Sequence, residues 1–350
     1  MRALRDIRMG LAAVLAAALG FGAMADAPPA PGKVYLLRYG SANAPGHPFS
    51  RADIAWIKYI EAKSGGRLKI QPFWGGTLIG SDTAVSEIRH GVADIGMISP
   101  IYMRGGVEAI KLQAAFYNGA RTAQEQTAVY ACLARDFPIL NQELPGLRVL
   151  AFQGGNLPGV ITRNRPITSL ADFRGMRLRT PAEMSPLLRR LGAEPVTMPM
   201  GEVYSALSKS VVDGVVSSAD TIKSMHFSEV ARYRNVVNIS RGAYPARAIS
   251  DRAWARLPAD LQALLAASQP YWEAQIAKET LAGEKAGLAF GDANGIKTVA
   301  FNPADQHRFD QLYNQLALET AASTAPSYGP AMFHRAQAAI AEIRAGRPPC

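Results

Sequence analysis

The sequence predicts an α/β protein folded as two lobes with a ligand site between them. Strand and helix patterns alternate through residues 34–152, an order typical of a mostly parallel sheet covered by helices. A second run of the same kind begins near residue 160 and continues to about residue 250, and a helix-rich stretch follows it. Two such units favour a clamshell, because ligand sites occur preferentially at domain interfaces.

Short apolar strands and capped helices define the first α/β run. Ser50, with Asp53 three residues later, predicts the N-cap of the first helix as a variant of the capping box. Gly91 closes the second helix, since glycine readily adopts the left-handed conformation that ends helices. The predicted strands lie at 34–39, around 68–70, at 93–99 and at 147–152, and helices are predicted from Ser50, over 81–90 and over 120–134.

The second run and the C-terminal third are predicted in the same way. A helical pattern over 260–289 contains Pro270, which must kink or divide that helix because proline lacks the N–H and crowds the preceding turn. The pattern leaves both outcomes open. The predicted strands are 176–180, 211–217, 246–250 and 297–301, and the last predicted helices are 305–320 and 331–345.

The first 25 residues have the pattern of a signal peptide. A start rich in arginine precedes an apolar run over 9–22 that is short for a membrane span, and a small-x-small cleavage site ends at Ala25. We therefore expect an exported, periplasmic protein that begins at Asp26. No second apolar run is long enough to span a bilayer, so we expect no stable membrane insertion of the mature chain.

Charge and cysteine content restrict the partners further. Subtracting the net +2 of residues 1–25 from the formal +10 of the whole chain leaves about +8. These basic residues are scattered rather than clustered, so we expect no nucleic-acid partner. Cys132 and Cys350 are the two cysteines, and with no C-x-x-C motif we expect neither redox catalysis nor a structural zinc site. Pairing is possible in an oxidising compartment, but two separate thiols are the favoured interpretation.

Arg179 is the residue with the clearest chemical role. It lies at the carboxyl end of a predicted strand that Pro181 terminates, and open α/β sheets bind ligands outside the carboxyl ends of their strands. The planar guanidinium fork matches the two oxygens of a carboxylate. We therefore predict that Arg179 anchors an acid.

Several short motifs, in order and at consistent spacing, resemble one family. The chain is similar to the extracytoplasmic solute-binding subunits of TRAP (tripartite ATP-independent periplasmic) transporters, the DctP-like group, over nearly all of its length after the signal peptide. The motifs are GHPF at 46–49, KSGGRL at 63–68, IRHGVADI at 88–95, SLADFRGMRLR at 169–179, MPMGEVYSAL at 198–207 and VVDG at 211–214.

The resemblance implies a two-lobed periplasmic binding protein, a flytrap, with crossing hinge strands and a long helix spanning both lobes. Lobe I would comprise 26–155 with part of 245–285, and lobe II would comprise 156–244 with part of 286–345. The implied function is capture of an organic acid for a two-subunit, ion-driven TRAP permease, with no cofactor. The arginine that pairs with the ligand carboxylate in the family falls on Arg179.

Two departures from the family pattern bear on the ligand. A second basic residue that many members carry falls here on Pro158 or Gly159, in the stretch that begins with the candidate ligand contact Asn156. A ligand-binding asparagine of many members falls on Ser217, a shorter donor. A pocket that has lost a charge and an amide favours a monocarboxylate with an apolar or aromatic body over a sugar acid or a small dicarboxylate.

Four further candidates each carry two interpretations. Trp74, among glycines after a strand, either stacks on a planar ligand or covers the core of its lobe. Asn43 lies in a loop that reaches the cleft or only forms a turn, and Ser99 at a strand end contacts the ligand or caps the next segment. Arg247 replaces the missing basic residue or, as favoured, faces solvent on an edge strand.

Other functions are less well supported by the sequence. The chain contains no G-x-S-x-G, H-E-x-x-H or glycine-rich phosphate loop, and its five histidines show no metal-ligand spacing, so we expect no enzyme. A binding protein serving a sensor kinase or another transporter class remains an alternative, as does a C4-dicarboxylate or keto-acid binder of the same family.

Overall fold

The computed structural model describes residues 33–103, 105–116, 119–348 and 350. The predicted signal peptide at 1–25 lies outside these residues. In the part of the chain that is described, no helix is both long enough and apolar enough to cross a bilayer.

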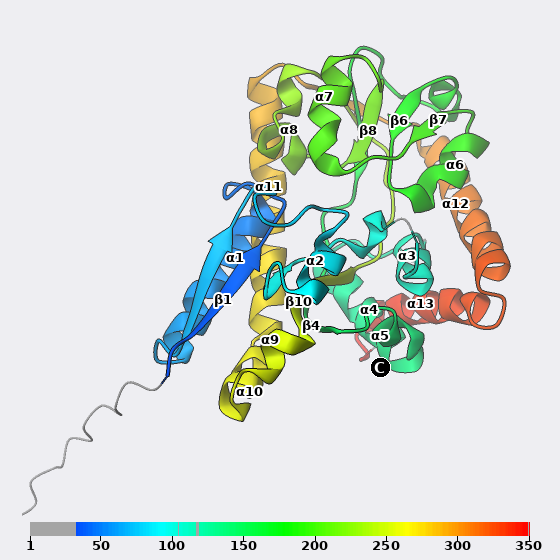
Figure 1. Ribbon diagram of the computed structural model, residues 1–350. Coiled ribbons are helices and arrows are strands. Elements are labelled where there is room, and N and C mark those ends of the chain that lie inside the picture. The colour runs from blue at the N-terminus through cyan, green and yellow to red at the C-terminus, as the bar shows by residue number, and fades with distance from the viewer. Residues whose placement is uncertain (1–32, 104, 117–118, 349) are drawn as a thin grey trace, which may run out of the picture.

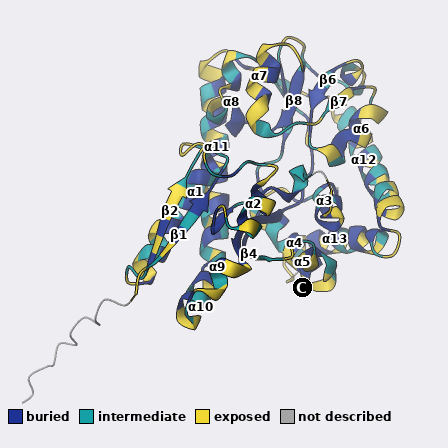
Figure 2. Cartoon of the chain, in the orientation of Figure 1, coloured by how far each residue is buried: buried dark blue, intermediate teal, exposed yellow. Residues whose placement is uncertain are grey.

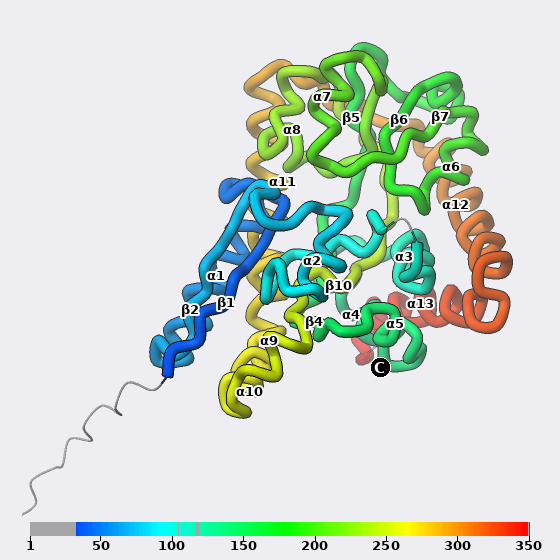
Figure 3. Tube along the Cα trace, in the orientation of Figure 1, coloured from blue at the N-terminus to red at the C-terminus, as the bar shows by residue number. Residues whose placement is uncertain are grey.

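Two lobes, each built on its own β-sheet, form the molecule (Figures 1 and 3). We call the five-stranded sheet β2-β1-β3-β10-β4 and its covering helices lobe I, and the six-stranded sheet β11-β9-β5-β8-β6-β7 with its helices lobe II. Lobe I contains β1 (Tyr35–Gly40), β2 (Leu68–Phe73), β3 (Ile95–Met97), β4 (Leu147–Gln153) and β10 (Tyr244–Ser250). Lobe II contains β5 (Gly159–Thr162), β6 (Arg177–Arg179), β7 (Glu194–Val196), β8 (Gly214–Ser217), β9 (Tyr233–Val236) and β11 (Lys297–Ala300).

Helices cover both sheets, and the buried residues gather along the strands and the inner helix faces (Figure 2). The first five helices are α1 (Pro48–Lys63), α2 (Ala84–His90), α3 (Glu108–Ala114), α4 (Ala123–Asp136) and α5 (Ile139–Gln142). The next three are α6 (Ser185–Arg190), α7 (Val203–Ser208) and α8 (Asp220–Ser224). The last five are α9 (Asp251–Ala255), α10 (Ala259–Ala267), α11 (Gln269–Ala293), α12 (Pro303–Thr324) and α13 (Gly329–Arg344).

The chain crosses between the sheets in two extended segments. Residues 154–158 lead from β4 to β5, and residues 237–243 lead from β9 back to β10, which pairs antiparallel with both β3 and β4. Helix α11 then packs against α1 of lobe I and α8 of lobe II. The predicted fold class, with crossing hinge strands and a long helix spanning both lobes, is confirmed.

A row of buried glycines lets α11 approach both lobes closely. A Cβ on Gly287 would lie 2.1 Å from the carbonyl oxygen of Ala219, just before α8. A Cβ on Gly283 would lie 2.6 Å from Cγ of Pro48 in α1 and 3.4 Å from Cβ of Asp220. Any larger residue at 287 would therefore push α11 away from the backbone before α8. Glycine is present here although it is less favourable in a helix than alanine.

Two helix boundaries differ from the patterns that predicted them. Pro270 lies in the first turn of α11, directly after α10 ends, so it divides the predicted helix rather than kinking it. Helix α1 begins at Pro48, where Nδ1 of the N-cap His47 accepts a hydrogen bond from the Phe49 amide. Ser50 and Asp53 are both buried inside α1, so the predicted capping box is wrong.

The prediction of two separate thiols is also wrong. Cys132 of α4 and Cys350 form a disulfide, with their Cα atoms 5.6 Å apart. Helix α13 packs against α3 and α4 of lobe I and so brings residue 350 beside α4. The two cysteines are 218 positions apart in the sequence, so no local pattern indicated this packing.

Arg247 is a structural residue of lobe I. The favoured prediction, that it faces solvent on an edge strand, is wrong. Strand β10 lies between β3 and β4, and the side chain of Arg247 is completely buried. Its Nε donates to Oδ1 of Asp53 at 2.7 Å, and its Nη1 donates to Oε1 of Gln153 at 2.8 Å. The Tyr39 hydroxyl and the Trp272 indole N–H also donate to Asp53. This buried carboxylate therefore joins three elements of lobe I and α11.

Candidate functional site

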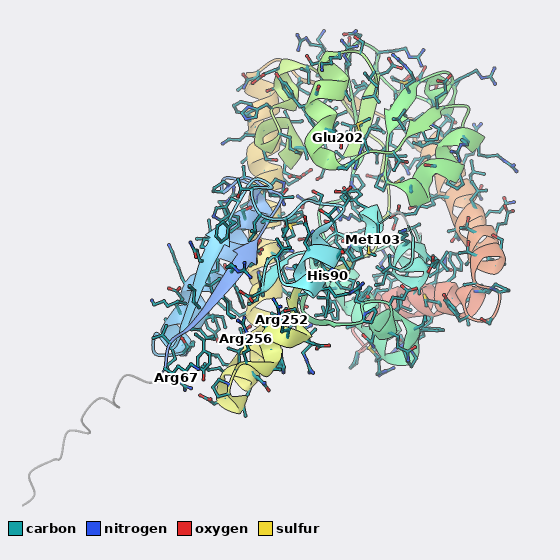
Figure 4. The ribbon with its side chains drawn as sticks, viewed as in Figure 1. Arg67, His90, Met103, Glu202, Arg252 and Arg256 are labelled. Carbon is teal, nitrogen blue, oxygen red and sulfur yellow. A yellow bond between two sulfur atoms is a disulfide. The ribbon has the colours of Figure 1, made fainter. Side chains whose placement is uncertain are left out.

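A cavity of about 170 Å³ lies between the lobes. Lobe I contributes Phe49 and Tyr102, lobe II contributes Arg179, and the crossing segments contribute Pro158 and Arg241. Figure 4 labels Met103 of lobe I, directly after Tyr102, and Glu202 of lobe II. Both lobes and both crossings therefore contribute to the wall of this cavity.

Arg179 is the most strongly positioned cation of the cavity. Strand β6 ends at Arg179, whose side chain is buried. Its Nε and Nη2 donate to the carbonyl oxygen of Met198 at 3.0 and 2.8 Å, and these bonds fix the plane of the guanidinium. Within the described residues, no hydrogen bond engages Nη1. That nitrogen keeps two donors for an anion.

Tyr102 shares the anchor with Arg179, and the sequence did not indicate it. Nη2 of Arg179 donates to the Tyr102 hydroxyl at 3.2 Å across the two lobes, and the guanidinium lies over the ring at 5.7 Å. Because this hydroxyl accepts from the arginine, its own proton is left to donate. Nη1 and the tyrosine hydroxyl together form a two-donor clamp for a carboxylate.

Arg241 supplies a second guanidinium that sequence reasoning missed. It is half-buried in the crossing 237–243, and no hydrogen bond or ion pair engages its side chain in the part of the chain described. A Cβ on Gly155 would lie 2.8 Å from its Nη1, so a larger residue at 155 would displace the guanidinium from this position. The basic residue missing at Pro158 or Gly159 therefore does not leave Arg179 as the sole guanidinium on the cavity wall, because Arg241 of the opposite crossing also lines it. The position of this arginine, shortly before the strand predicted at 246–250, was the signal that could have indicated it.

Two carboxyl groups also line the cavity. Burial raises the pKa of Glu183 to about 7, while Lys111, Arg179 and Arg241 act in the opposite direction. Its Oε2 is buried without a hydrogen-bond partner among the described residues. Burial likewise raises the pKa of Asp220, which accepts a hydrogen bond from the Ser218 hydroxyl. The cavity is therefore less negative at neutral pH than its composition suggests.

Glu183 makes the stability of the ligand-free protein depend on pH. Its folded pKa of about 7 exceeds the reference value of 4.5, so the folded state binds the proton more tightly and loses stability as the pH rises from 4.5 past 7. We expect Glu183→Gln to raise the melting temperature relative to the unsubstituted protein more at pH 8 than at pH 5. The exposed Glu194→Gln serves as the control and should show the same difference at both pH values. A difference for Glu183→Gln that is also independent of pH would contradict the assignment.

Four of the predicted contacts line the same cavity. Asn43 donates from Nδ2 to Sδ of Met97 at 3.1 Å, and Asn156 donates to the Thr280 carbonyl at 2.8 Å. Ser99 precedes a short 3₁₀ helix without capping it, and Ser217 accepts a hydrogen bond from the Thr221 hydroxyl. These side chains form a polar rim with Arg179, and the amides are held by protein partners.

Trp74 and Arg247 are not among the residues that line the cavity. Trp74 packs on Tyr39, with ring centroids 5.5 Å apart, and joins the core of lobe I, as in the second interpretation of that residue. Arg247 is held by Asp53 as described above.

A second cavity of about 280 Å³ adjoins the first. It lies between α3 of lobe I, α6 of lobe II and α12, and it shares Glu183 and Tyr313 with the first cavity. Its walls are mainly apolar, with Leu112, Phe116 and Leu187 among them.

Comparison with known proteins identifies the family to which the chain belongs. The family model described as bacterial extracellular solute-binding protein, family 7, matches residues 39–324. The chain is 27% identical over 282 residues to an uncharacterized protein, y4mM, of Sinorhizobium fredii, covering 78% of this chain and 50% of that protein. It is 32% identical over 157 residues to the C4-dicarboxylate-binding periplasmic protein DctP of Rhodobacter capsulatus, covering 43% of this chain and 46% of that protein.

The matches thus span about half the length of these two relatives. Among solved structures, a TRAP solute-binding protein from Rhodoferax ferrireducens in complex with copurified benzoate has a similar fold. Its TM-score is 0.80 at 21% identity, covering 89% of this chain and 99% of that one. Because the family model covers most of the chain, the protein belongs to the bacterial extracellular solute-binding proteins of family 7, the DctP family, which are binding proteins rather than enzymes.

Proposed function

We propose that the protein is the periplasmic solute-binding subunit of a TRAP transporter and captures an organic acid between its lobes. The observation that carries this proposal is the buried guanidinium of Arg179, which lines the cavity with Nη1 uncommitted among the described residues. Export would follow removal of the signal peptide near Ala25. The protein would then deliver the acid to a two-subunit membrane permease.

The ligand is a monocarboxylate with an apolar or aromatic body. The walls around the polar rim include Phe49, Ile101, Met184 and Met200, and the adjoining cavity is mainly apolar. The benzoate complex of the Rhodoferax ferrireducens protein supports this class, whereas the name of the Rhodobacter capsulatus relative favours a C4-dicarboxylate. The carboxyl groups of Glu183 and Asp220 weigh against the dicarboxylate, because they offset part of the positive charge.

Capture proceeds by closure of the lobes about the crossings 154–158 and 237–243. Lobe I, residues 26–155 with part of 245–285, moves against lobe II, residues 156–244 with part of 286–345. The acid first meets Arg179 in lobe II, and closure brings Tyr102 of lobe I onto the same carboxylate. Closure also removes water, which strengthens a well hydrogen-bonded ion pair.

A melting-temperature screen against acids tests the proposal. A ligand at a hundred times its dissociation constant stabilises the folded state by about 2.7 kcal/mol. We expect aromatic and branched monocarboxylates, such as benzoate, phenylacetate and 4-methylvalerate, to raise the melting temperature more than succinate or glucuronate does. Stronger stabilisation by succinate or glucuronate would overturn the ligand class. No stabilisation by any acid would overturn the proposed function.

A further inference from the structure

We propose that Arg241 is a second ligand-binding residue, which donates to an oxygen on carbon 2 of the bound acid. The cleft would then prefer 2-oxo and 2-hydroxy acids to acids that lack this oxygen. This inference rests on the proposed function of the cleft and specifies the chemistry of its ligand.

The backbone around Arg241 holds its side chain at the cavity. The Ile239 amide donates to the Pro158 carbonyl at 3.3 Å, and the Gly242 amide donates to the Ala114 carbonyl at 2.9 Å. A Cβ on Gly242 would lie 2.8 Å from the carbonyl oxygen of Gln113, so the crossing is packed tightly against α3. The guanidinium lies against Gly155 of the other crossing. Backbone contacts therefore fix the position of residue 241 beside the cavity.

Arg241 differs from the two buried arginines in having no side-chain hydrogen-bond partner among the described residues. Arg179 donates to Met198 and Tyr102, and Arg247 is bound to Asp53 and Gln153. None of the five N–H donors of Arg241 has a hydrogen-bond acceptor within the described chain. A guanidinium that lines a binding cavity in this state has its donors available to a ligand.

The charges around the cavity favour a neutral acceptor for this second arginine. Burial raises the pKa values of Glu183 and Asp220, and the charge of Arg241 opposes both shifts. Arg179 also opposes the shift of Glu183, so both guanidinium groups are within electrostatic reach of the same carboxyl. None of these arginine–carboxyl pairs forms an ion pair in the described residues. Two guanidinium groups that share the cavity with two carboxyl groups leave little positive charge for a second ligand carboxylate.

The size of the cavity places the acceptor close to the carboxylate. At about 170 Å³ it is smaller than the roughly 300–1,000 Å³ common for ligand sites. Arg179 and Arg241 line this one space, and both act on the carboxyl of Glu183, so we expect them to reach neighbouring atoms of a ligand. The atom next to a carboxylate anchored on Arg179 is carbon 2, and an oxo or hydroxyl oxygen there is an acceptor for Arg241.

Matched pairs of acids and a variant without the guanidinium donors test this inference. The pairs are phenylpyruvate with 3-phenylpropionate, and 4-methyl-2-oxovalerate with 4-methylvalerate, measured by calorimetry on the full mature chain. The variant Arg241→Met keeps an unbranched apolar stem and removes the donors. The exposed Arg189→Met removes a charge from lobe II outside the cavity and is the control.

We expect the unsubstituted protein and Arg189→Met to bind the 2-oxo member of a pair roughly 10- to 100-fold more tightly. In Arg241→Met this preference should fall to within about threefold, because the 2-oxo acid loses more affinity than its partner without the oxygen, whereas Arg241→Lys should retain part of the preference. Unchanged melting temperature without ligand would show that the variant folds.

Three outcomes overturn the inference. Equal loss of affinity for both members of a pair would assign Arg241 a general electrostatic role and leave the proposed function standing. A preference for benzylmalonate that depends on Arg241 would show that the second group is a carboxylate. Failure of every acid to bind the unsubstituted protein would overturn the proposed function itself, and this inference with it.

Discussion

Replacing Arg179 with alanine is expected to weaken acid binding by about a hundredfold or more while the protein stays folded. Removing one partner of a buried charge pair costs about 3–5 kcal/mol, since the other charge is left uncompensated, and each 1.4 kcal/mol is tenfold in affinity. Nη1 is lost together with the Nη2 bond that orients the Tyr102 hydroxyl, so both donors of the clamp are affected. Calorimetric titration with the best acid of the screen measures the change.

Arg177→Ala is the matched control for this variant. Arg177 lies on the same strand two residues earlier, pairs with Asp213 at 2.7 Å and does not line the cavity. Its removal should leave affinity within about threefold. Arg179→Lys should recover only part of the binding, because one ammonium group cannot hold the Met198 carbonyl and clamp a carboxylate at once. Unchanged affinity in Arg179→Ala would remove this residue from the site.

Asp53→Ala is expected to lower the free energy of unfolding by about 3–5 kcal/mol, measured by urea denaturation. The substitution leaves the completely buried guanidinium of Arg247 without its counter-charge, and it also removes the acceptor for Tyr39 and Trp272. Desolvation of an unpaired charge dominates the cost.

Two variants separate charge loss from the loss of side-chain volume. Asp260→Ala breaks the exposed pair with Arg67 and should change the stability far less than Asp53→Ala does, because water screens an exposed pair. The double variant Asp53→Leu, Arg247→Met removes both charges and should recover much of the stability, because apolar replacement of a whole buried pair is often near neutral. If the double variant were as unstable as Asp53→Ala, packing rather than charge would explain the loss.

The sequence predicted the fold well because the relevant signals are local. Alternating strand and helix patterns reported the two sheets, and a proline directly after a strand marked the position of Arg179. The predicted contacts Asn43 and Ser99 follow strands of lobe I in the same way, and the structure places them at the cavity. Strand ends in an α/β sheet converge on one edge, so position in sequence is enough to bring such residues together.

The remaining features depend on contacts between distant segments. The partner of Arg247 is Asp53, 194 residues away on α1, and a pattern of small residues around Arg247 resembled an edge strand. The hydrogen bond between Arg179 and Tyr102 joins the two lobes, so no local sequence pattern indicates it. Arg241 was not predicted, because the family pattern has its second basic residue in the crossing 154–158. In this chain the second arginine of the cavity lies in the other crossing, 237–243.

The glycines of α11 connect the outer side of the molecule to the shape of the binding cavity. Gly287 sets how closely α11 approaches the start of α8, and α8 carries Asp220 and Thr221, which line the cavity. The width of the cavity is therefore fixed partly by a residue that no ligand touches. A substitution at such a helix-packing position can therefore change the shape of the cavity while every residue of the polar rim stays the same.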